Sequence, residues 1–186
     1  MYELNLDDEL AIKLKQLRIT KGYSLTELAQ LSTISRASIS RIENAEVSPT
    51  TQVLAKLCDA LGTSMSSLLA MFESNDASLI KYAQQIQWQD QHTGFTRRSV
   101  SPPNANFKAE VIRCHLKVGA EITYEHASSV ACEHHLVMLE GSLELVIENE
   151  CYVLNAGDCL RYQLNSGSQF KANGTIDAQY LIVLVR

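Results

Sequence analysis

The sequence predicts a chain of two domains, in which a small all-α domain is followed by an all-β domain. In the first 72 residues, apolar side chains recur every three or four positions, as they do along one face of a helix. From residue 107 onward, short runs rich in β-branched and aromatic residues alternate with turn signals. Seven or eight such runs within about 80 residues are typical of a small sandwich or barrel.

Five helices are expected in the first domain. The first covers residues 7–21, where Leu10, Leu14 and Leu17 share one face and Gly22 follows as a stop. The others are expected, in chain order, as two short helices within 24–44, one helix from Thr50 to a stop at Gly62, and one from Thr63 or Ser64 to near Phe72.

Residues 24–44, SLTELAQLSTISRASISRIEN, carry the clearest functional signal. Ser24 and Glu27 have the spacing of a capping box that starts one short helix, and Ser35 can cap the next. Ala29 is small enough to let the two helices cross closely over a seam of leucines and isoleucines. These features indicate a helix-turn-helix, whose second helix enters the major groove of DNA. The alternative is an ordinary helical hairpin within a small bundle.

Residues 8–71 resemble the DNA-binding domain of the Xre/phage-repressor family, through the segments LTELAQ, ISRASISRIEN, SPT and LAKLCDALG. The resemblance implies a five-helix, lambda-repressor-like domain that binds operator DNA. One position departs from the family pattern, because Thr33 stands where the turn usually has glycine. A left-handed backbone at Thr33 would be strained, so we expect this turn to be built differently.

The exposed side of the second short helix is the expected DNA-reading surface. An arginine there can grip guanine through O6 and N7, whereas serine hydroxyls, amides and backbone N–H groups hold phosphates. Because one such unit buries little surface, we expect a homodimer on a double-stranded operator with two half-sites. The residues expected to face bases are Arg36, Ala37, Ser40 and Arg41, and those expected to hold phosphates are Ser24, Ser35, Ser38 and Asn44.

The composition of the chain changes after residue 72. Residues 73–105 are rich in turn-forming residues and contain two strand-like pieces, IQWQ and FTRRSV, so we interpret them as a linker and the first strands of the second domain. The helix-turn-helix domain is therefore expected at 7–72 and the β domain at 106–186. Glu140-Gly141 and Glu148-Asn149 are expected hairpin turns.

The second domain resembles the cupin family, whose members are jelly-roll barrels with a ligand or metal in the mouth. The resemblance is carried by Gly119, His126, the run HHLVMLEG that ends at Gly141, and LNAGD at 154–158. It also implies where a metal would bind: the family's four ligand positions fall on His126, Ser128, His134 and Ser168.

Two imidazoles thus stand where the family has four metal ligands, and a tight zinc site needs three or four protein donors. His126 and His134 are expected either to hold a divalent metal such as zinc or to line the pocket of an organic ligand. Arg113 and Arg161 lie on predicted strands, and a buried arginine is costly unless it meets an anion. An inward arginine would favour a carboxylate-bearing effector, and an outward one would be a surface charge. The expected ligand-binding residues are Tyr124, His126, His134, Arg161 and Tyr162.

Composition and charge indicate where in the cell the protein works and how strongly it binds DNA nonspecifically. No apolar run is long enough to span a bilayer, and the acidic N-terminus is unlike a secretory signal. Five cysteines without a CxxC pair are expected to be buried thiols of a cytoplasmic protein. The net charge of −5 predicts weak nonspecific binding to DNA, and hence dependence on base contacts.

These observations predict a sequence-specific transcriptional regulator whose cupin domain binds a small-molecule effector. The combined resemblance implies an effector such as an amino acid or a sulfur metabolite. We expect no enzymatic activity and no catalytic residues, because no catalytic motif is present. Two alternatives stay open: a metal-dependent cupin enzyme with a regulatory DNA-binding domain, and an antitoxin-like DNA-binding protein whose second domain binds a protein partner.

Overall fold

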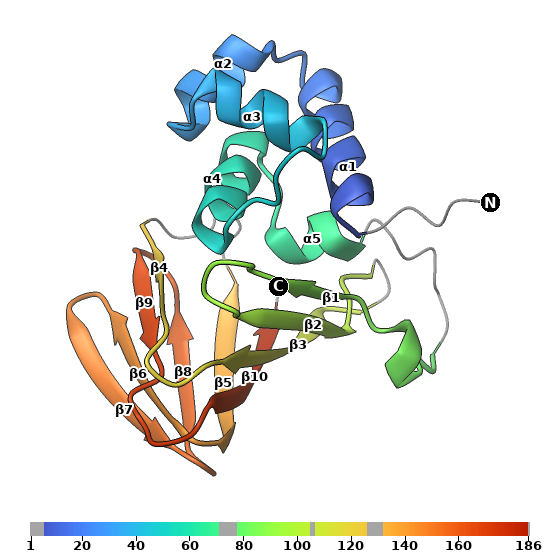
Figure 1. Ribbon diagram of the computed structural model, residues 1–186. Helices are drawn as coiled ribbons and strands as arrows, with labels where there is room; N and C mark the ends of the chain where they lie inside the picture. Colours follow the sequence, from blue (N-terminus) through green and yellow to red (C-terminus); the bar gives the residue numbers. More distant parts are fainter. Residues whose placement is uncertain (1–5, 71–77, 105–106, 126–131, 186) are drawn as a thin grey trace.

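The computed structural model describes residues 6–70, 78–104, 107–125 and 132–185 (Figure 1). Its N-terminal part contains the five expected helices, and none of the helices in the described ranges is long and apolar enough to cross a membrane. The helices are α1 (Leu6–Thr20), α2 (Leu25–Ser32), α3 (Arg36–Glu43), α4 (Thr51–Leu61) and α5 (Met65–Ala70), followed by a short 3₁₀-helix, η1 (Tyr82–Gln84).

Helices α2 and α3 begin at the expected caps. The Ser24 hydroxyl accepts the Glu27 N–H at 3.2 Å, and the Glu27 carboxylate accepts the Ser24 N–H at 2.7 Å. The Ser35 hydroxyl accepts the Ser38 N–H at 3.1 Å. Each bond satisfies a donor that the first turn of a helix leaves unpaired, so the sequence itself sets where both helices start.

The turn between α2 and α3 corrects one expectation. Thr33 adopts the left-handed conformation (φ 58°, ψ 18°), so the backbone follows the path that a glycine would give it. The strain of a β-branched residue in this region is offset by local hydrogen bonds. The Ser32 hydroxyl donates to the Leu28 carbonyl at 2.7 Å and accepts the Ile34 N–H at 3.3 Å, which ties both sides of the turn together.

The β domain is a sandwich of two antiparallel sheets. The larger sheet has the order β1-β2-β3-β10-β5-β8 and the smaller one the order β4-β9-β6-β7. The eight strands from β3 through β10 are paired as in a jelly roll. Strands β1 and β2 extend its larger sheet. The strands are β1 (Gln87–Gln89), β2 (Thr96–Ser101), β3 (Ala109–Leu116), β4 (Glu121–Tyr124), β5 (Glu133–Glu140), β6 (Ser142–Ile147), β7 (Glu150–Asn155), β8 (Cys159–Gln163), β9 (Ser168–Lys171) and β10 (Ala178–Val185).

Strand β9 is the one that the sequence pattern did not predict. Its four residues contain a single large apolar side chain, Phe170, so alternation gives little signal. Pairing with β4 and β6 nevertheless holds it inside the smaller sheet and places Ser168 opposite Tyr124. Both expected hairpin turns are present, with positive φ at Gly141, Glu148 and Asn149.

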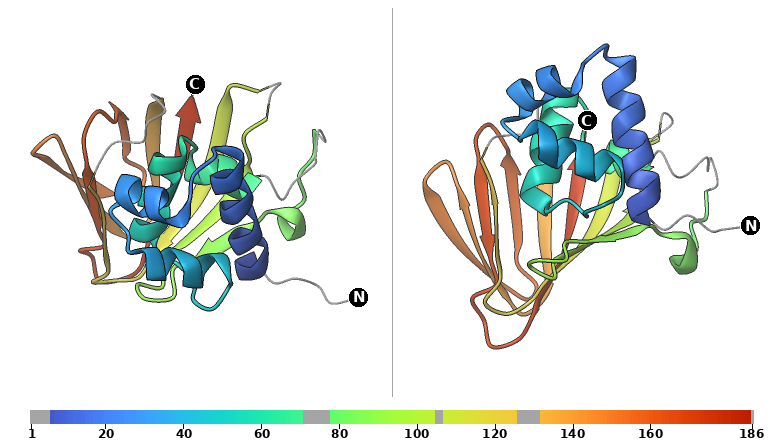
Figure 2. Two further views of the ribbon diagram at one scale, coloured as in Figure 1. Left: turned by 90° about the horizontal axis from the view of Figure 1, so that it is seen from above. Right: turned by 45° about the horizontal axis from the view of Figure 1, so that its top comes forward.

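The helical domain covers one end of the sandwich (Figures 1 and 2). Helix α4 contacts β4 and helix α5 contacts β2, so these two helices form the contact layer, and α2 and α3 lie farther from the sheets. The buried apolar side chains form one continuous cluster from Leu10 of α1 to Leu184 of β10. The two domains therefore share a core.

A buried aspartate joins the two domains. The Asp90 side chain, in the β1–β2 loop, is 2% exposed and accepts both the backbone N–H of Thr51 at 2.8 Å and its hydroxyl at 2.7 Å. It also accepts the N–H groups of His92 and Thr93 at 2.9 and 3.3 Å. Thr51 is the first residue of α4, so a negative charge is held at the positive end of that helix.

The cysteines divide into two groups, all of them free thiols. Cys58 and Cys114 are buried and Cys132 is half-buried, but Cys151 and Cys159 are exposed. The expectation of five buried thiols is therefore wrong for the last two. They lie on β7 and β8, each at the edge of its sheet, where apolar sequence context does not ensure burial.

We predict that Asp90→Asn lowers the free energy of unfolding by about 1–3 kcal/mol, because it weakens several hydrogen bonds to a buried charge. Burial alone raises the pKa of Asp90, but the hydrogen bonds from Thr51, His92 and Thr93 outweigh it and the pKa lies below its ordinary value. The stabilisation is therefore complete above the unfolded-state pKa of about 3.9 and is lost as pH falls through the lower folded-state value.

Urea unfolding of the two proteins at a series of pH values measures this effect, with Glu150→Gln on the exposed edge strand β7 as the control. The stability difference between wild type and Asp90→Asn should shrink in acid. A difference that is zero at neutral pH would contradict the assignment.

Candidate functional site

The outer face of α3 is open to solvent. Arg36, Ala37, Arg41 and Asn44 are exposed, whereas Ser40 is half-buried. The opposite face packs inward through Ile39 and Ile42, and α3 contacts α1 and α2. Among the described residues, no part of the sandwich covers the outer face, so the surface expected to read DNA is accessible (Figure 1).

A buried ion pair fixes α3 against α1. Arg18 Nε lies 2.7 Å from Glu43 Oε1, and Arg18 Nη2 lies 2.7 Å from Glu43 Oε2. The two side chains are only 11% and 5% exposed. Arg18 Nη1 also donates to the Tyr23 carbonyl at 2.9 Å, so this arginine joins α1, the start of α2 and the last turn of α3. The two-pronged geometry restrains rotation of α3 about its axis.

The predicted phosphate-binding residues already have structural roles. The hydroxyls of Ser24 and Ser35 cap their helices, and the hydroxyls of Ser35 and Ser38 lie 2.8 Å apart. Asn44 Nδ2 donates to Glu46 Oε1 at 3.3 Å. Glu46 Oε2 also lies 3.6 Å from Arg41 Nε, with both side chains more than half exposed. An acidic residue thus stands beside the predicted DNA-reading arginine.

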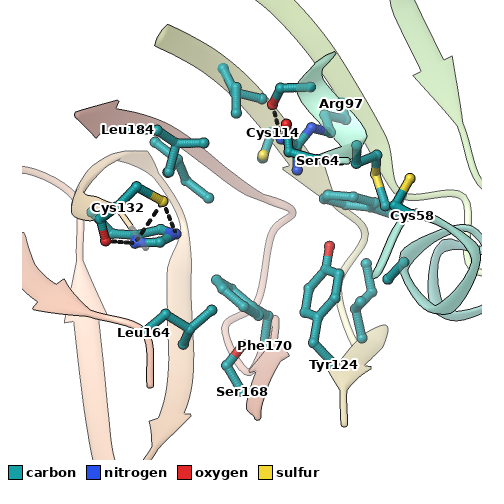
Figure 3. A pocket seen from close by; sticks show the side chains of 18 of the residues that line it. Cys58, Ser64, Arg97, Cys114, Tyr124, Cys132, Leu164, Ser168, Phe170 and Leu184 are labelled. Carbon is teal, nitrogen blue, oxygen red and sulfur yellow. Dashed lines mark hydrogen bonds between the residues drawn. The ribbon is translucent and has the colours of Figure 1, made fainter. Parts of the chain in front are cut away.

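The second candidate site is a cavity of about 130 Å³ between the helices and the sandwich (Figure 3). Helices α4 and α5 supply one wall, and strands of both sheets supply the others. Figure 3 shows Cys58 on the helical side, and Tyr124, Phe170 and Leu184 on the strands, around the same space. Its polar or ionisable lining residues include Cys58, Asp59, Ser64, Ser66, Arg97, Cys114, Tyr124, Cys132, His134, Tyr162, Ser168 and Tyr180.

Most of the ionisable groups in this cavity are neutral at physiological pH. Burial raises the pKa of Tyr124 to about 12, although the positive charge of Arg97 opposes the shift. Burial likewise raises the pKa of Cys58 to about 12 and that of Cys114 to about 11. Burial also raises the pKa of Tyr162 far above its usual value. The charge of the cavity is therefore set by few groups.

His134, one of the two histidines expected to line a pocket, lies in the wall of the cavity. It is 9% exposed and its ring stacks on Tyr162 with centroids 4.9 Å apart. Burial lowers its pKa, which favours the neutral ring at pH 7, and Nδ1 lies 3.2 Å from the Cys132 carbonyl oxygen. Neighbouring His135 turns the other way and meets Glu133 at 2.6 Å.

The metal prediction depends partly on His126, which lies outside the described residues. Within the described ranges, no three side chains of the metal-binding types cluster. The Ser168 hydroxyl occupies the position where the cupin pattern has its last histidine, and it cannot replace an imidazole as a zinc ligand. The described residues alone do not fit a zinc site, which needs three or four donors.

The arginine that lines the cavity is not the one that we expected. Arg161 is exposed on the outer face of β8, and Arg113 is exposed on β3 and donates to Gln179 at 2.9 Å. Arg161 is therefore withdrawn from the cavity-lining set, because strand parity turns it outward. Arg97 on β2 is the arginine that reaches the cavity, and the sequence reasoning missed it. The only sequence signal was the strand-like run FTRRSV, in which Arg97 and Arg98 must face opposite ways.

Residues 14–68 match the family of helix-turn-helix domains. Over 158 residues the chain is 28% identical to the HTH-type transcriptional regulator SutR of Escherichia coli (strain K12). The matched region covers 85% of this chain and 84% of SutR. It is 29% identical to the HTH-type transcriptional regulator PuuR of the same organism over 155 residues, 83% of this chain and 82% of PuuR. The chain is also 40% identical over 58 residues to SinR of Bacillus subtilis (strain 168), 31% of this chain and 52% of SinR.

Among solved structures, the chain is similar to an HTH_3 family transcriptional regulator from Vibrio cholerae. The TM-score is 0.79 at 21% identity, and the match covers 97% of this chain and 96% of the other. The likeness extends over both domains, so the arrangement of a helix-turn-helix domain followed by an antiparallel β domain is a shared fold.

We predict that Glu43→Gln lowers the free energy of unfolding by about 3 kcal/mol, since it leaves the Arg18 guanidinium buried without a counter-charge. The double variant Arg18→Met/Glu43→Met should lose less than the single variant, because both charges are removed together. Thermal and urea unfolding measure the two values. A single variant as stable as the wild type would show that the pair does not hold α3.

Proposed function

We propose that this chain, whose residues 14–68 form a helix-turn-helix domain, is a sequence-specific transcriptional regulator controlled by a small effector in the cavity between its two domains. The observation that carries the proposal is the position of α3. Its outer face is exposed and carries Arg36 and Arg41, while α4 and α5 of the same domain form a wall of the cavity. One rigid five-helix unit would therefore contact DNA on one side and effector on the other.

In this proposal α3 lies in the major groove of an operator. Arg36, Ala37, Ser40 and Arg41 face base edges, where an arginine can bind guanine with two hydrogen bonds. The phosphate contacts come from Ser24, Ser35, Ser38 and Asn44, together with nearby backbone N–H groups, and they set the position of the helix without reading sequence. A single unit buries little DNA surface, so two copies of the chain bind two half-sites.

The effector changes DNA binding only if it binds the DNA-competent and incompetent forms unequally. The location of the cavity supports such a difference, because its lining comes from both domains. Tyr124, His134 and Tyr162 provide the sandwich side of the proposed ligand contacts, and the residues around Cys58 and Ser66 provide the helical side. Any shift of the helical domain changes the shape of the binding site.

Selection from a pool of random duplexes tests the proposal. The full-length protein should enrich one sequence with two related half-sites whose centres are about one helical turn apart. Enrichment of no sequence would refute regulation through α3.

On the selected duplex, Arg41→Ala should weaken binding by about 1–3 kcal/mol and relax selectivity at the contacted base pair. Arg113→Ala, which removes an exposed arginine from β3, is the matched control and should leave affinity unchanged. Equal affinity and selectivity of Arg41→Ala and wild type, measured by fluorescence anisotropy, would remove Arg41 from the base-reading set.

Glu46→Gln should act in the opposite direction and raise operator affinity roughly threefold to tenfold at low salt. The substitution removes a carboxylate that repels phosphates and that holds Arg41 and Asn44 through contacts of 3.6 and 3.3 Å. The gain should fade as salt is raised, because exposed charges are screened. A salt-independent gain would point to a change in folding instead.

A further inference from the structure

Arg97 brings a permanent positive charge into the cavity. It lines the space together with Cys58 on the helical side and Tyr124 and His134 on the sandwich side, and its positive charge opposes the burial that raises the pKa of Cys58 and Tyr124. Its guanidinium is held by neutral groups: Nη2 donates to Ser66 Oγ at 2.6 Å, and the Tyr124 side chain is a second hydrogen-bond partner. A guanidinium has five N–H donors. An anion can accept two of them at once and forms stronger, charge-assisted hydrogen bonds than a neutral hydroxyl does.

The rest of the cavity favours a compact apolar ligand body. Phe95, Ile112, Ile122, Phe170 and Leu184 line it beside the neutral tyrosines. A volume of about 130 Å³ is close to that of an engineered protein cavity of about 150 Å³ that binds benzene. The space therefore suits a molecule of about six to ten non-hydrogen atoms.

The Ser168 hydroxyl is a second polar group in the wall of the same cavity. The Ser168 hydroxyl on β9 is buried, with the residue 5% exposed, and it has no hydrogen-bond partner among the described residues. Buried hydroxyls are normally paired, since leaving one unpaired is costly. Ser168 lines the cavity opposite Tyr124 on the neighbouring strand, so a ligand oxygen or nitrogen could pair with it.

Asp59 of α4 is the one carboxylate among the described lining residues, and it lies on the helical side. A ligand anion is therefore favoured near Arg97 and disfavoured near α4.

We propose that the cavity binds a small carboxylate with an apolar body, that the carboxylate pairs with Arg97, and that this pairing breaks the bond from Arg97 to Ser66. The proposal rests on the function proposed above and names the chemistry of its effector. Ser66 belongs to α5 and Arg97 to β2, so loss of their bond loosens α5 from the sandwich. The Asp90–Thr51 contact holds the start of α4 and becomes the pivot of the movement.

Calorimetric titration of the full-length protein compares three probes at millimolar concentration: isovalerate, its amide isovaleramide, and leucine. Isovalerate or leucine should bind at least about tenfold more tightly than isovaleramide, because only they carry a carboxylate for a charge-assisted pair. Preference for leucine over isovalerate would support the same carboxylate assignment and would show that the cavity also accepts an ammonium group. Binding of the amide as tightly as the acids, or binding of none, would overturn the proposal.

Variants of neighbouring arginines locate the anion site. Arg97→Gln should lower carboxylate affinity at least about tenfold, whereas Arg98→Gln should not change it. Arg98 is a matched control because it turns outward, bonds to Gln87 and lies 4.2 Å from the Tyr82 ring centroid. If Arg97→Gln fails to fold, Arg97→Lys keeps the charge but lacks the two-pronged geometry, and it should still weaken binding. Unchanged affinity in the folded Arg97 variant would refute the site.

Ser66→Ala tests the coupling to DNA. It removes the bond that the ligand is proposed to break, so its operator affinity without ligand should equal that of the liganded wild type, and the carboxylate should change it less than twofold. A Ser66→Ala protein that responds to carboxylate as the wild type does would refute the coupling. Operator binding by the unliganded wild type is measured first, so failure of regulation through α3 is distinguished from failure of the ligand assignment.

Discussion

The structure depends on the contact between the buried carboxylate of Asp90 and the first turn of α4. The carboxylate accepts the N–H and hydroxyl of Thr51 at 2.8 and 2.7 Å, and two further N–H groups of its own loop. A charge buried this deeply is stable only when its hydrogen bonds are complete. The contact therefore fixes the start of α4 against the β1–β2 loop, beside the cavity that α4 and α5 help to line.

Two consequences follow for the helical domain. Helices α4 and α5 form the wall of a ligand-sized space, and α3 lies farther from the sheets than they do (Figure 1). The Arg18–Glu43 pair then holds α3 in a fixed orientation relative to α1 through two hydrogen bonds of 2.7 Å. Ligand and DNA would thus act on opposite sides of one packed unit, which is the simplest physical route for coupling between them.

Much of the fold was predictable because its signals are local. The capping box at Ser24 and the cap at Ser35 place two helices without reference to the rest of the chain. The glycine-like turn at Thr33 was not predictable, since the bonds through Ser32 that compensate its strain form only when the turn is assembled. Strand β9 was missed for a similar reason: its polar residues become a strand only between β4 and β6.

By itself, the sequence determined the five helices, the caps that start α2 and α3, the exposed basic face of α3 and the jelly-roll character of the second half. Those features depend on spacing along the chain, which is visible in one dimension. Only the tertiary structure decided which arginine enters the cavity, because a shift of one residue along a strand reverses every side chain. It turned Arg161 outward and Arg97 inward, and it placed the cavity between the two domains, where the packing of α4 and α5 completes a site that neither domain forms alone.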